Sequence, residues 1–208
     1  NNPKYLNLYN KIEQYVQTHF INKEYGEWYA YLHYDGTVSN HVKGNIGKGP
    51  FHIPRMLLLL EKMDFDSILD GAILDVGCGY GPIGIYASYI TKKAVVMLDI
   101  NPRAISLSKE NLRLNNVEAT VLESDCLDNV FDKKFACVIT NPPIHAGKNV
   151  IYKIYEQSYE VLIPGGALWI VIQEKHGAPS TIKFLKTIFP TVEVFYKKKG
   201  FYILKCIK

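Results

Sequence analysis

The chain has 208 residues, 48% of them hydrophobic and 21% charged, and its formal net charge is +4 at pH 7. This length and apolar content predict one ordinary domain with a sizeable core and a small appendage, and they leave little room for two full domains. No apolar run approaches the roughly 18 residues that a membrane span requires, and the mild positive charge permits a polyanionic partner without requiring one.

The first part of the chain predicts a helix followed by a small hairpin. Apolar residues recur at close to helical spacing between residues 5 and 20, which indicates an amphipathic helix. In WYAYLHYDGTVSN (28–40), aromatic residues alternate up to Asp35-Gly36, a dipeptide that suits a tight hairpin turn because glycine takes a positive φ without strain. Residues 41–55 are rich in glycine and proline and predict a loop, and MLLLLEKM (56–63) predicts a buried helix.

From Ala72 onward, predicted strands alternate with predicted helices. The strands are short apolar runs, at residues 72–76, 94–100, 117–123, 135–140 and 166–173. The helices lie at residues 81–90, 102–116, 149–162 and 179–189. Helices of this length between strands imply crossover connections, and hence a mostly parallel sheet covered on both faces. The stretch TVEVFYKKKGFYILKCI (191–207) has no room for a crossover helix, so its two strands are expected to pair antiparallel. The predicted fold class is α/β, a doubly wound, mostly parallel seven-stranded sheet that ends in an antiparallel β-hairpin.

Three acidic residues follow or end consecutive predicted strands. Asp75 precedes the loop Gly77-Cys78-Gly79, where glycines let a ligand approach the backbone and the next helix presents free N–H groups. This loop alone is a weak signal, since its plain interpretation is a tight turn and dinucleotide binding is a rival use of such a loop. Asp99 ends the second strand and Asp125 follows the third. Because the carboxyl ends of parallel strands meet at one crevice, these acids predict an adenosine pocket, with Asp99 on the ribose hydroxyls and Asp125 on the adenine amino group.

The motifs ILDVGCGYGPIGI, LDINPRAI, ESDC and TNPPIHAG, in this order and spacing, resemble those of class I S-adenosylmethionine-dependent methyltransferases. The resemblance covers about residue 48 to the C-terminus, so we expect an N-terminal extension at residues 1–47 and a methyltransferase domain at residues 48–208. Asn-Pro-Pro after the fourth strand is similar to the amino-methylating branch. The NPP-x-H form, the PGGxLWIVI strand and the KKKG hairpin are similar to small ribosomal-RNA guanine-N2 methyltransferases.

This resemblance implies S-adenosylmethionine as the cofactor and ribosomal RNA, or a ribosomal subunit, as the partner. It implies that Asp75 and the Gly77–Gly79 loop face the methionine portion of the cofactor, Asp99 the ribose and Asp125 the adenine. The full set of cofactor-binding residues that it implies is Asp75, Gly77, Cys78, Gly79, Asp99, Ile100, Asp125, Cys126 and Asn141.

Asn-Pro-Pro has a chemical use in such an enzyme. An exocyclic amine or amide nitrogen has its lone pair delocalised into a π-system and attacks a methyl sulfonium poorly. Acceptors aimed at its two hydrogens localise the lone pair and hold the nitrogen in line with the methyl carbon. The Asn141 carboxamide oxygen and the Pro142 carbonyl are the candidate acceptors, because Pro142 and Pro143 fix the carbonyl direction and donate no competing hydrogen bond. A purely structural Pro-Pro turn is the alternative.

Ile144 departs from the aromatic residue that often follows Asn-Pro-Pro in amino methyltransferases, where the ring stacks on the target base. Ile144 stays a candidate catalytic residue because it offers an apolar face, and Phe51 or Tyr80 could supply the ring. His145 fits a contact to the base or a phosphate about as well as a surface or N-cap position. Lys148 could hold a phosphate, although a solvated lysine fits its position better.

The segment KGNIGKGPFHIPR (43–55) resembles the one that closes over the cofactor in this family, with Phe51 and Arg55 as candidate lid residues. Packing of Phe51 onto the first sheet helix is an equal alternative. Gly-Lys-Gly-Pro lacks the spacing of a Walker loop, which argues against nucleotide triphosphate hydrolysis. If RNA is the substrate, lysines around the crevice, including Lys148 and Lys175, are expected to meet its phosphates.

Three other functions stay open. Glutamine N5 methylation is the first, because a side-chain amide presents the same two hydrogens, but Ile144 stands where glutamine methyltransferases have tyrosine. A nicotinamide-dependent oxidoreductase would use a similar glycine loop and Asp99 without explaining Asn-Pro-Pro. A non-catalytic RNA-binding relative is the third, and the presence of Asp75, Asp99 and Asn141 argues against it.

The four cysteines show neither CxxC pairing nor Cys/His ligand spacing; they are Cys78, Cys126, Cys137 and Cys206. We therefore expect no disulfide framework and no metal site. Reduced thiols fit a cytoplasmic protein. The opening residues NNPKYLNLYN lack the basic-then-apolar layout of a secretory signal, which also favours an intracellular, soluble protein without a membrane partner.

Overall fold

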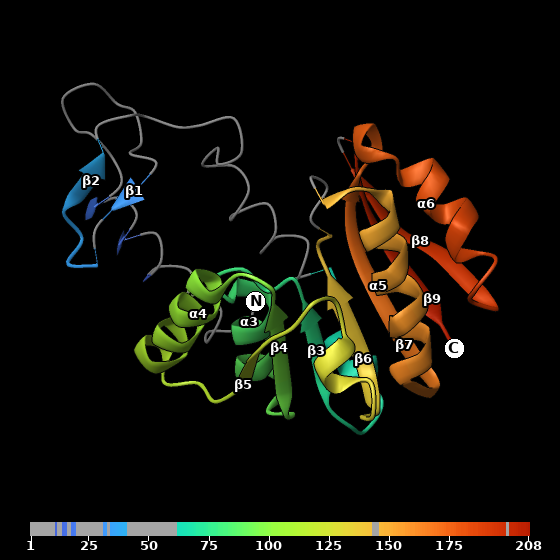
Figure 1. Cartoon of the computed structure of the whole chain (residues 1–208), viewed down its shortest axis with the longest axis horizontal. Coiled ribbons are helices and arrows are strands. Elements are labelled where there is room, and N and C mark those ends of the chain that lie inside the picture. Colours follow the sequence, from blue (N-terminus) through green and yellow to red (C-terminus); the bar gives the residue numbers. More distant parts are fainter. Residues whose placement is uncertain are drawn as a thin grey trace. The chain divides into compact units, whose positions relative to one another are not determined.

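Figure 1 shows the computed structural model, in which the structure describes residues 11, 14, 15, 18, 19, 31, 32, 34–40, 62–142, 146–198 and 200–208. The chain divides into two compact units, residues 1–58 and residues 59–208. The boundary expected between residues 47 and 48 falls outside the described residues and stays a prediction.

The first unit contains the predicted hairpin. Strand β1 (Tyr31–Leu32) pairs antiparallel with β2 (Val38–Asn40). In the turn between them, Asp35 Oδ1 accepts hydrogen bonds from Thr37 N at 2.9 Å and Thr37 Oγ1 at 2.6 Å. Gly36 has a φ of 83°, so the Asp-Gly turn forms for the reason expected from the sequence. The described residues between positions 11 and 19 are helical, as predicted, whereas the helix expected at residues 56–63 lies almost wholly outside the described residues.

The second unit is built on a seven-stranded sheet with the order β5-β4-β3-β6-β7-β9-β8. Its strands are β3 (Ile73–Val76), β4 (Val95–Asp99), β5 (Thr120–Glu123), β6 (Phe135–Thr140), β7 (Leu162–Gln173), β8 (Thr191–Lys198) and β9 (Phe201–Ile207). Strands β3 to β7 pair in parallel, and β9 pairs antiparallel with both β7 and β8. The predicted α/β fold class, including the final antiparallel hairpin, is confirmed.

Four α-helices connect these strands, as the sequence predicted: α3 (Pro82–Thr91), α4 (Pro102–Asn115), α5 (Lys148–Val161) and α6 (Ala178–Leu185). Short 3₁₀ turns occur at η1 (Phe65–Ser67), η2 (Asp128–Val130) and η4 (Glu174–His176). Helix α6 ends earlier than expected, because the chain tightens into i→i+3 bonds, from Thr187 N to the Phe184 carbonyl at 2.9 Å and from Ile188 N to the Leu185 carbonyl at 3.0 Å.

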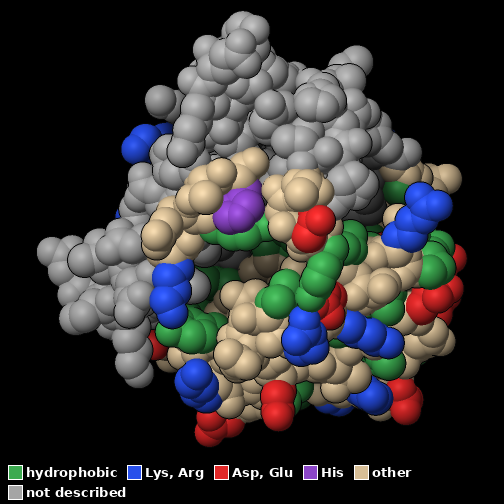
Figure 2. All heavy atoms as spheres, turned by 90° about the vertical axis from the view of Figure 1, so that its left-hand side faces the viewer, with side chains coloured by type: hydrophobic (Ala, Val, Ile, Leu, Met, Phe, Trp, Pro, Cys, Tyr) green, Lys and Arg blue, Asp and Glu red, His purple; other side chains and the backbone are tan. Residues whose placement is uncertain are grey.

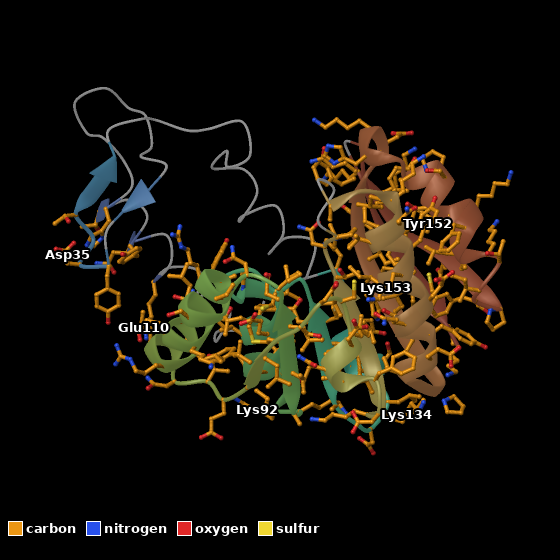
Figure 3. The ribbon with its side chains drawn as sticks, in the orientation of Figure 1. Asp35, Lys92, Glu110, Lys134, Tyr152 and Lys153 are labelled. Carbon is orange, nitrogen blue, oxygen red and sulfur yellow. The ribbon has the colours of Figure 1, made fainter. Side chains whose placement is uncertain are left out.

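Helices α5 and α6 bury one face of the sheet around β7 and β9. The buried positions of α5 include Ile151, Ile154, Tyr155 and Ser158, a spacing that places them on one helical face. Ile151, Ile154 and Tyr155 join a core cluster with Leu168 of β7, which is fully buried. Burying such an aliphatic side chain stabilises the fold by about 1.5 to 3 kcal/mol. Tyr152, which is labelled in Figure 3, lies on the partly exposed side of α5 and stacks on Phe184 of α6, with ring centroids 3.7 Å apart.

The parallel strands all end at one edge of the sheet, which we call the carboxyl edge and which is uppermost in Figure 1. The turn between β8 and β9 lies at the same edge, because Phe201 at the start of β9 pairs with Gln173 at the end of β7. At the opposite edge, which we call the amino edge, the chain leaves α3 and enters β6, at Lys92 and Lys134 in Figure 3. The carboxyl edge is where an open α/β sheet holds its ligand.

Candidate functional site

The loop after β3 is fixed to the neighbouring strand by its backbone. Gly77 N and Cys78 N both donate to the Leu98 carbonyl of β4, at 2.9 and 2.8 Å, and Gly81 N donates to the Cys78 carbonyl at 2.9 Å. Gly79 has a φ of 58°, and a Cβ placed on it would meet no described atom within 4 Å. The Cα of Gly79 therefore faces open space, so a ligand can approach the backbone closely there.

Asp75 is fully buried directly beneath this loop. Its Oδ2 accepts a hydrogen bond from Gly84 N of α3 at 2.8 Å. Its Oδ1 has no hydrogen-bond partner among the described residues. Burial raises the pKa of Asp75 to about 7, although the Gly84 N–H lowers it, and the negative charge of Asp99 raises it further. A buried oxygen without a donor is a place where a cationic ligand group would be stabilised.

Asp99 is held by two backbone donors at the end of β4. Its Oδ2 accepts from Gly79 N at 2.8 Å, and its Oδ1 accepts from Asn101 N at 2.9 Å. Each carboxylate oxygen keeps a further lone pair, so both can still accept hydroxyl hydrogen bonds. The next residue, Ile100, is 64% exposed and offers an apolar surface beside the carboxylate. This pair can hold a sugar and cover the face of an attached ring.

Asp125 is exposed just beyond the end of β5. Ser124 N donates to the Asp99 carbonyl at 3.0 Å, which ties the two strand ends together. The buried Cys126 has a φ of 50°, and its thiol donates to Asp125 Oδ1 at 3.3 Å. Burial raises the pKa of Cys126 to about 11, and the hydrogen bond to Asp125 adds to the increase. This thiol is therefore neutral near pH 7 and does not act as a nucleophile.

Asn141 directly follows β6. Thr140, the last residue of β6, is paired with Val76 of β3 and donates its Oγ1 hydrogen to the Val76 carbonyl at 2.9 Å. Since Gly77 and Asn141 follow these two paired residues, the amide lies at the strand end beside the glycine loop. Asn141 is exposed and Pro142 is buried. Pro143, Ile144 and His145 lie outside the described residues, so the roles expected for them stay predictions.

The four strands β5, β4, β3 and β6 are neighbours in the sheet. They therefore bring the predicted acids, the glycine loop and Asn141 together at one edge, as the parallel topology required. Tyr80, a candidate stacking residue, is 37% exposed beside the loop, and burial raises its pKa to about 12. The other candidates, Phe51 and Arg55, lie outside the described residues. Lys148 and Lys175 are exposed near the carboxyl ends of β6 and β7.

Two polar residues of α4 hold the loop in place and were missed from the sequence. Buried Ser108 donates its Oγ hydrogen to the Gly79 carbonyl at 2.8 Å. Asn111 Nδ2 donates to the Tyr80 carbonyl at 2.7 Å. A signal for Ser108 existed, because it interrupts a stripe of apolar residues, Ile105 and Leu112, at helical spacing.

Gly84 is a further missed residue. A Cβ on Gly84 would lie 2.6 Å from Met97 Cγ and 3.1 Å from Asp75 Oδ2. Glycine is therefore required here so that the helix backbone can approach the buried carboxylate. The local sequence gave no signal beyond a glycine inside a helix, which would otherwise cost about 1 kcal/mol relative to alanine.

Within residues 62–142, 146–198, 200–208 and the described part of the first unit, no group of three His, Cys, Asp or Glu side chains could hold a metal ion. None of the helices in these same ranges has the length and apolar character needed to cross a membrane. The four cysteines are all buried as free thiols.

Two family models match the chain. One, described as methyltransferase small domain, matches residues 56–205. The other, N-acylglucosamine 2-epimerase, matches residues 1–53, which is a minor part of the chain and does not include the site at the carboxyl edge.

The chain is similar to several curated proteins. It is 47% identical over 154 residues to the uncharacterized protein YbxB of Bacillus subtilis, covering 73% of this chain and 76% of that protein. It is 29% identical over 198 residues to the ribosomal RNA small subunit methyltransferase C of Photorhabdus laumondii, covering 91% of this chain and 56% of that protein. It is 30% identical over 164 residues to the putative protein N5-glutamine methyltransferase MJ0928 of Methanocaldococcus jannaschii, covering 69% of this chain and 81% of that protein. The chain therefore spans little more than half the length of its ribosomal RNA methyltransferase relative.

A solved structure of similar fold is the T. thermophilus 16S rRNA N2 G1207 methyltransferase (RsmC) in complex with AdoMet and guanosine. The match has a TM-score of 0.66 and 22% sequence identity, and it covers 81% of this chain and 46% of that one. At this identity the match shows the fold alone.

Proposed function

The chain belongs to the methyltransferase small domain family, and on that premise we propose that it methylates the exocyclic N2 amine of guanine in ribosomal RNA. It is a class I S-adenosylmethionine-dependent methyltransferase with a Rossmann-like fold. The choice of ribosomal RNA is supported by the relative from Photorhabdus laumondii, whose name states that substrate. Ribosomal RNA is accordingly the proposed partner.

The residues at the carboxyl edge fit the cofactor. Asp75 Oδ1 is a buried acceptor without a described donor, as the ammonium group of the methionine portion requires. Asp99 keeps lone pairs for the ribose hydroxyls, and the exposed side chain of Ile100 suits one face of the adenine. Asp125 would accept from the adenine amino group. When bound, S-adenosylmethionine supplies an electrophilic methyl group on a sulfonium.

The position of Asn141 is the observation that best supports an amine as the group that receives the methyl. Its carboxamide is exposed at the end of β6, and the Thr140 to Val76 hydrogen bond anchors that end beside the glycine loop. We propose that the Asn141 oxygen and the Pro142 carbonyl accept hydrogen bonds from the two amine hydrogens. These contacts localise the nitrogen lone pair, which is the main obstacle to methylation of an exocyclic amine. Proline suits the second position because it has no N–H to compete for an acceptor.

The methyl transfer requires no strong base in this site. The amine nitrogen forms a bond to the methyl carbon as the methyl–sulfur bond breaks, and it is then cationic and acidic. It can release one proton to water after transfer, while the Asn141 and Pro142 oxygens stay neutral throughout. The target guanine must leave its base stack to reach Asn141, at a cost of a few kcal/mol.

The direct test is transfer of tritium from labelled cofactor to small-subunit RNA that lacks the modification, followed by nucleoside analysis. Label in N2-methylguanosine supports the proposal, and Asn141→Ala serves as a control in which label transfer should be about a hundredfold slower. Glutamine N5 methylation is the second candidate because of the similarity to the archaeal protein named for it. Label in protein rather than RNA would replace the proposal with that function.

A further inference from the structure

The carboxyl edge continues past Asn141 into a second half formed by β7, β9 and β8. Gln173, the last residue of β7, pairs with Phe201, and Phe201 pairs with Lys198, the last residue of β8. Glu174 N donates to the Gly200 carbonyl at 2.7 Å, which fixes the β8–β9 turn to the chain that leaves β7. The ends of these three strands therefore lie side by side.

Three exposed lysines lie at the ends of these strands: Lys175 of η4 with Lys197 and Lys198 of β8. We call them the basic ledge. One acid, Glu174, lies within the ledge. Glu174 Oε1 accepts from the Tyr202 hydroxyl at 3.0 Å and pairs with Lys197 Nζ at 3.5 Å. Lys197 Nζ also lies 4.5 Å from the centre of the Tyr202 ring, so its position is fixed by two neighbours. The ledge keeps a net positive charge.

The three acids of the predicted site and the three lysines of the basic ledge lie on different strands of the carboxyl edge. The half formed by β3, β4 and β5 carries Asp75, Asp99 and Asp125, which suits a cofactor that is cationic at its sulfonium and ammonium groups. The half formed by β7, β9 and β8 carries the basic ledge, which suits a polyanion. Asn141 follows β6, the strand between the two halves.

Two lysines at the amino edge already have partners. At the amino edge, Lys93 forms an ion pair with Asp70 at 3.2 Å, and Lys92 Nζ lies 4.9 Å from the centre of the Tyr89 ring. Figure 2 shows the face on the α4 side, where the described basic and acidic side chains are interspersed rather than gathered by sign. The basic ledge differs from these surfaces in lying at the carboxyl edge, where Lys175 follows β7, the strand next to β6.

We propose that the basic ledge binds the phosphate backbone of the RNA strand that flanks the target guanine. This inference rests on the proposed function and adds where the RNA lies, on the side of Asn141 away from the cofactor. Lys175 and Lys198 contact phosphates directly. Lys197 and Glu174 keep the turn in position, since their contacts join it to the end of β7.

The test compares two charge-matched double variants of the full chain. Lys175→Gln with Lys198→Gln removes two charges from the ledge, and Lys92→Gln with Lys134→Gln removes two from the amino edge in Figure 3. Lys197 is retained because its contacts hold the turn. Dissociation constants for the substrate RNA and for S-adenosylhomocysteine are measured at several salt concentrations, and label transfer to RNA by the unaltered protein is measured in parallel.

The ledge variant is expected to bind RNA about tenfold more weakly at low salt. Its plot of log affinity against log salt should be shallower by about 1.4, the value for two contacts to single-stranded phosphates. Its cofactor affinity and the RNA affinity of the amino-edge variant should be unchanged. If the unaltered protein transfers label to RNA but both variants keep the original salt slope, the ledge inference is wrong and the proposed function stands. If the unaltered protein neither binds nor labels RNA, both are wrong.

Discussion

The buried carboxyl group of Asp75 should couple cofactor binding to pH. Burial raises its pKa from 3.8 to about 7, which corresponds to about 4 kcal/mol of unfavourable free energy for the ionised form at about 1.36 kcal/mol for each pKa unit. Its Oδ1 is the buried oxygen without a described donor. A ligand ammonium placed at that oxygen would offset much of this energy by favouring the carboxylate.

The effect on stability has a defined sign. Between about pH 4 and pH 7 the folded protein holds a proton on Asp75 that the unfolded chain has released. The contribution of this group therefore makes the free energy of unfolding fall as pH rises through that window, and it levels off above about pH 7. Asp75→Asn removes the titrating group. The free energy of unfolding of this variant, measured by urea denaturation, should therefore not show this decrease between about pH 4 and pH 7.

Binding has the opposite trend, because the carboxylate is the form that a ligand ammonium needs. The dissociation constant of S-adenosylhomocysteine should rise about tenfold for each pH unit below about 7, because Asp75 becomes protonated while the α-ammonium of the ligand stays charged. Calorimetry at pH 6.5 in two buffers of different ionisation enthalpy should detect about 0.8 proton released for each ligand bound, the protonated fraction of a group with a pKa of about 7.

Two controls isolate Asp75 as the source. 5′-Methylthioadenosine lacks the ammonium and should release no proton, and Asp75→Asn should release none with either ligand. The neighbouring Cys78 cannot supply the proton, because the pKa of its thiol is raised to about 12, mainly by burial. Equal proton release by the two ligands, or release by Asp75→Asn, would refute the reasoning.

Three further predictions concern groups that touch or support the site. Asn141→Ala should lower kcat about a hundredfold with cofactor affinity intact, by analogy with the loss of one preorganised polar group. Turnover assays measure kcat and calorimetry measures the cofactor affinity; an equal loss of kcat and affinity would mean that Asn141 is structural. Gly84→Ala brings a Cβ within 2.6 Å of Met97 Cγ, so it should destabilise the fold by about 1 to 3 kcal/mol in urea denaturation, and an unchanged midpoint would contradict the close approach. Ser108→Ala leaves the Gly79 carbonyl without its donor and should cost about 1 kcal/mol while weakening cofactor binding, whereas exposed Ser106→Ala should do neither.

The order and class of the main elements follow from periodicity, and so does the meeting of the acids. Asp75, Asp99 and Asp125 are far apart in sequence, but parallel strands with crossover helices have to bring their carboxyl ends to one edge. That inference needed no side-chain contact. The support of the loop by Ser108 could not be inferred with equal force, because it depends on the rotation of α4 against β4, which long-range packing decides.

Strand β7 shows a second limit of local reasoning. It begins at Leu162, before Pro164 and Gly165, which the sequence placed outside the strand predicted to start at Gly166. The extension is paired with the C-terminus: Gly165 N donates to the Lys208 carbonyl at 2.9 Å, and Lys208 N donates to the Gly166 carbonyl at 3.0 Å. Glycine and proline disfavour a strand in isolation, but partners more than forty residues away satisfy the backbone here.

The place of β6 in the sheet explains why an amide at its end can serve a reaction between two oppositely charged molecules. Strand β6 pairs with β3 on one side and with β7 on the other. The residue that follows Thr140 therefore lies between the strands that carry the three acids and the strands that carry the basic ledge. A carboxylate at position 141 would add negative charge towards the phosphates, and a lysine would repel the sulfonium. A neutral carboxamide offers an acceptor oxygen to the amine without repelling either the cofactor or the RNA. Asn141→Asp should therefore bind RNA more weakly than the unaltered protein in the same binding assay, whereas Asn141→Ala should keep the original RNA affinity.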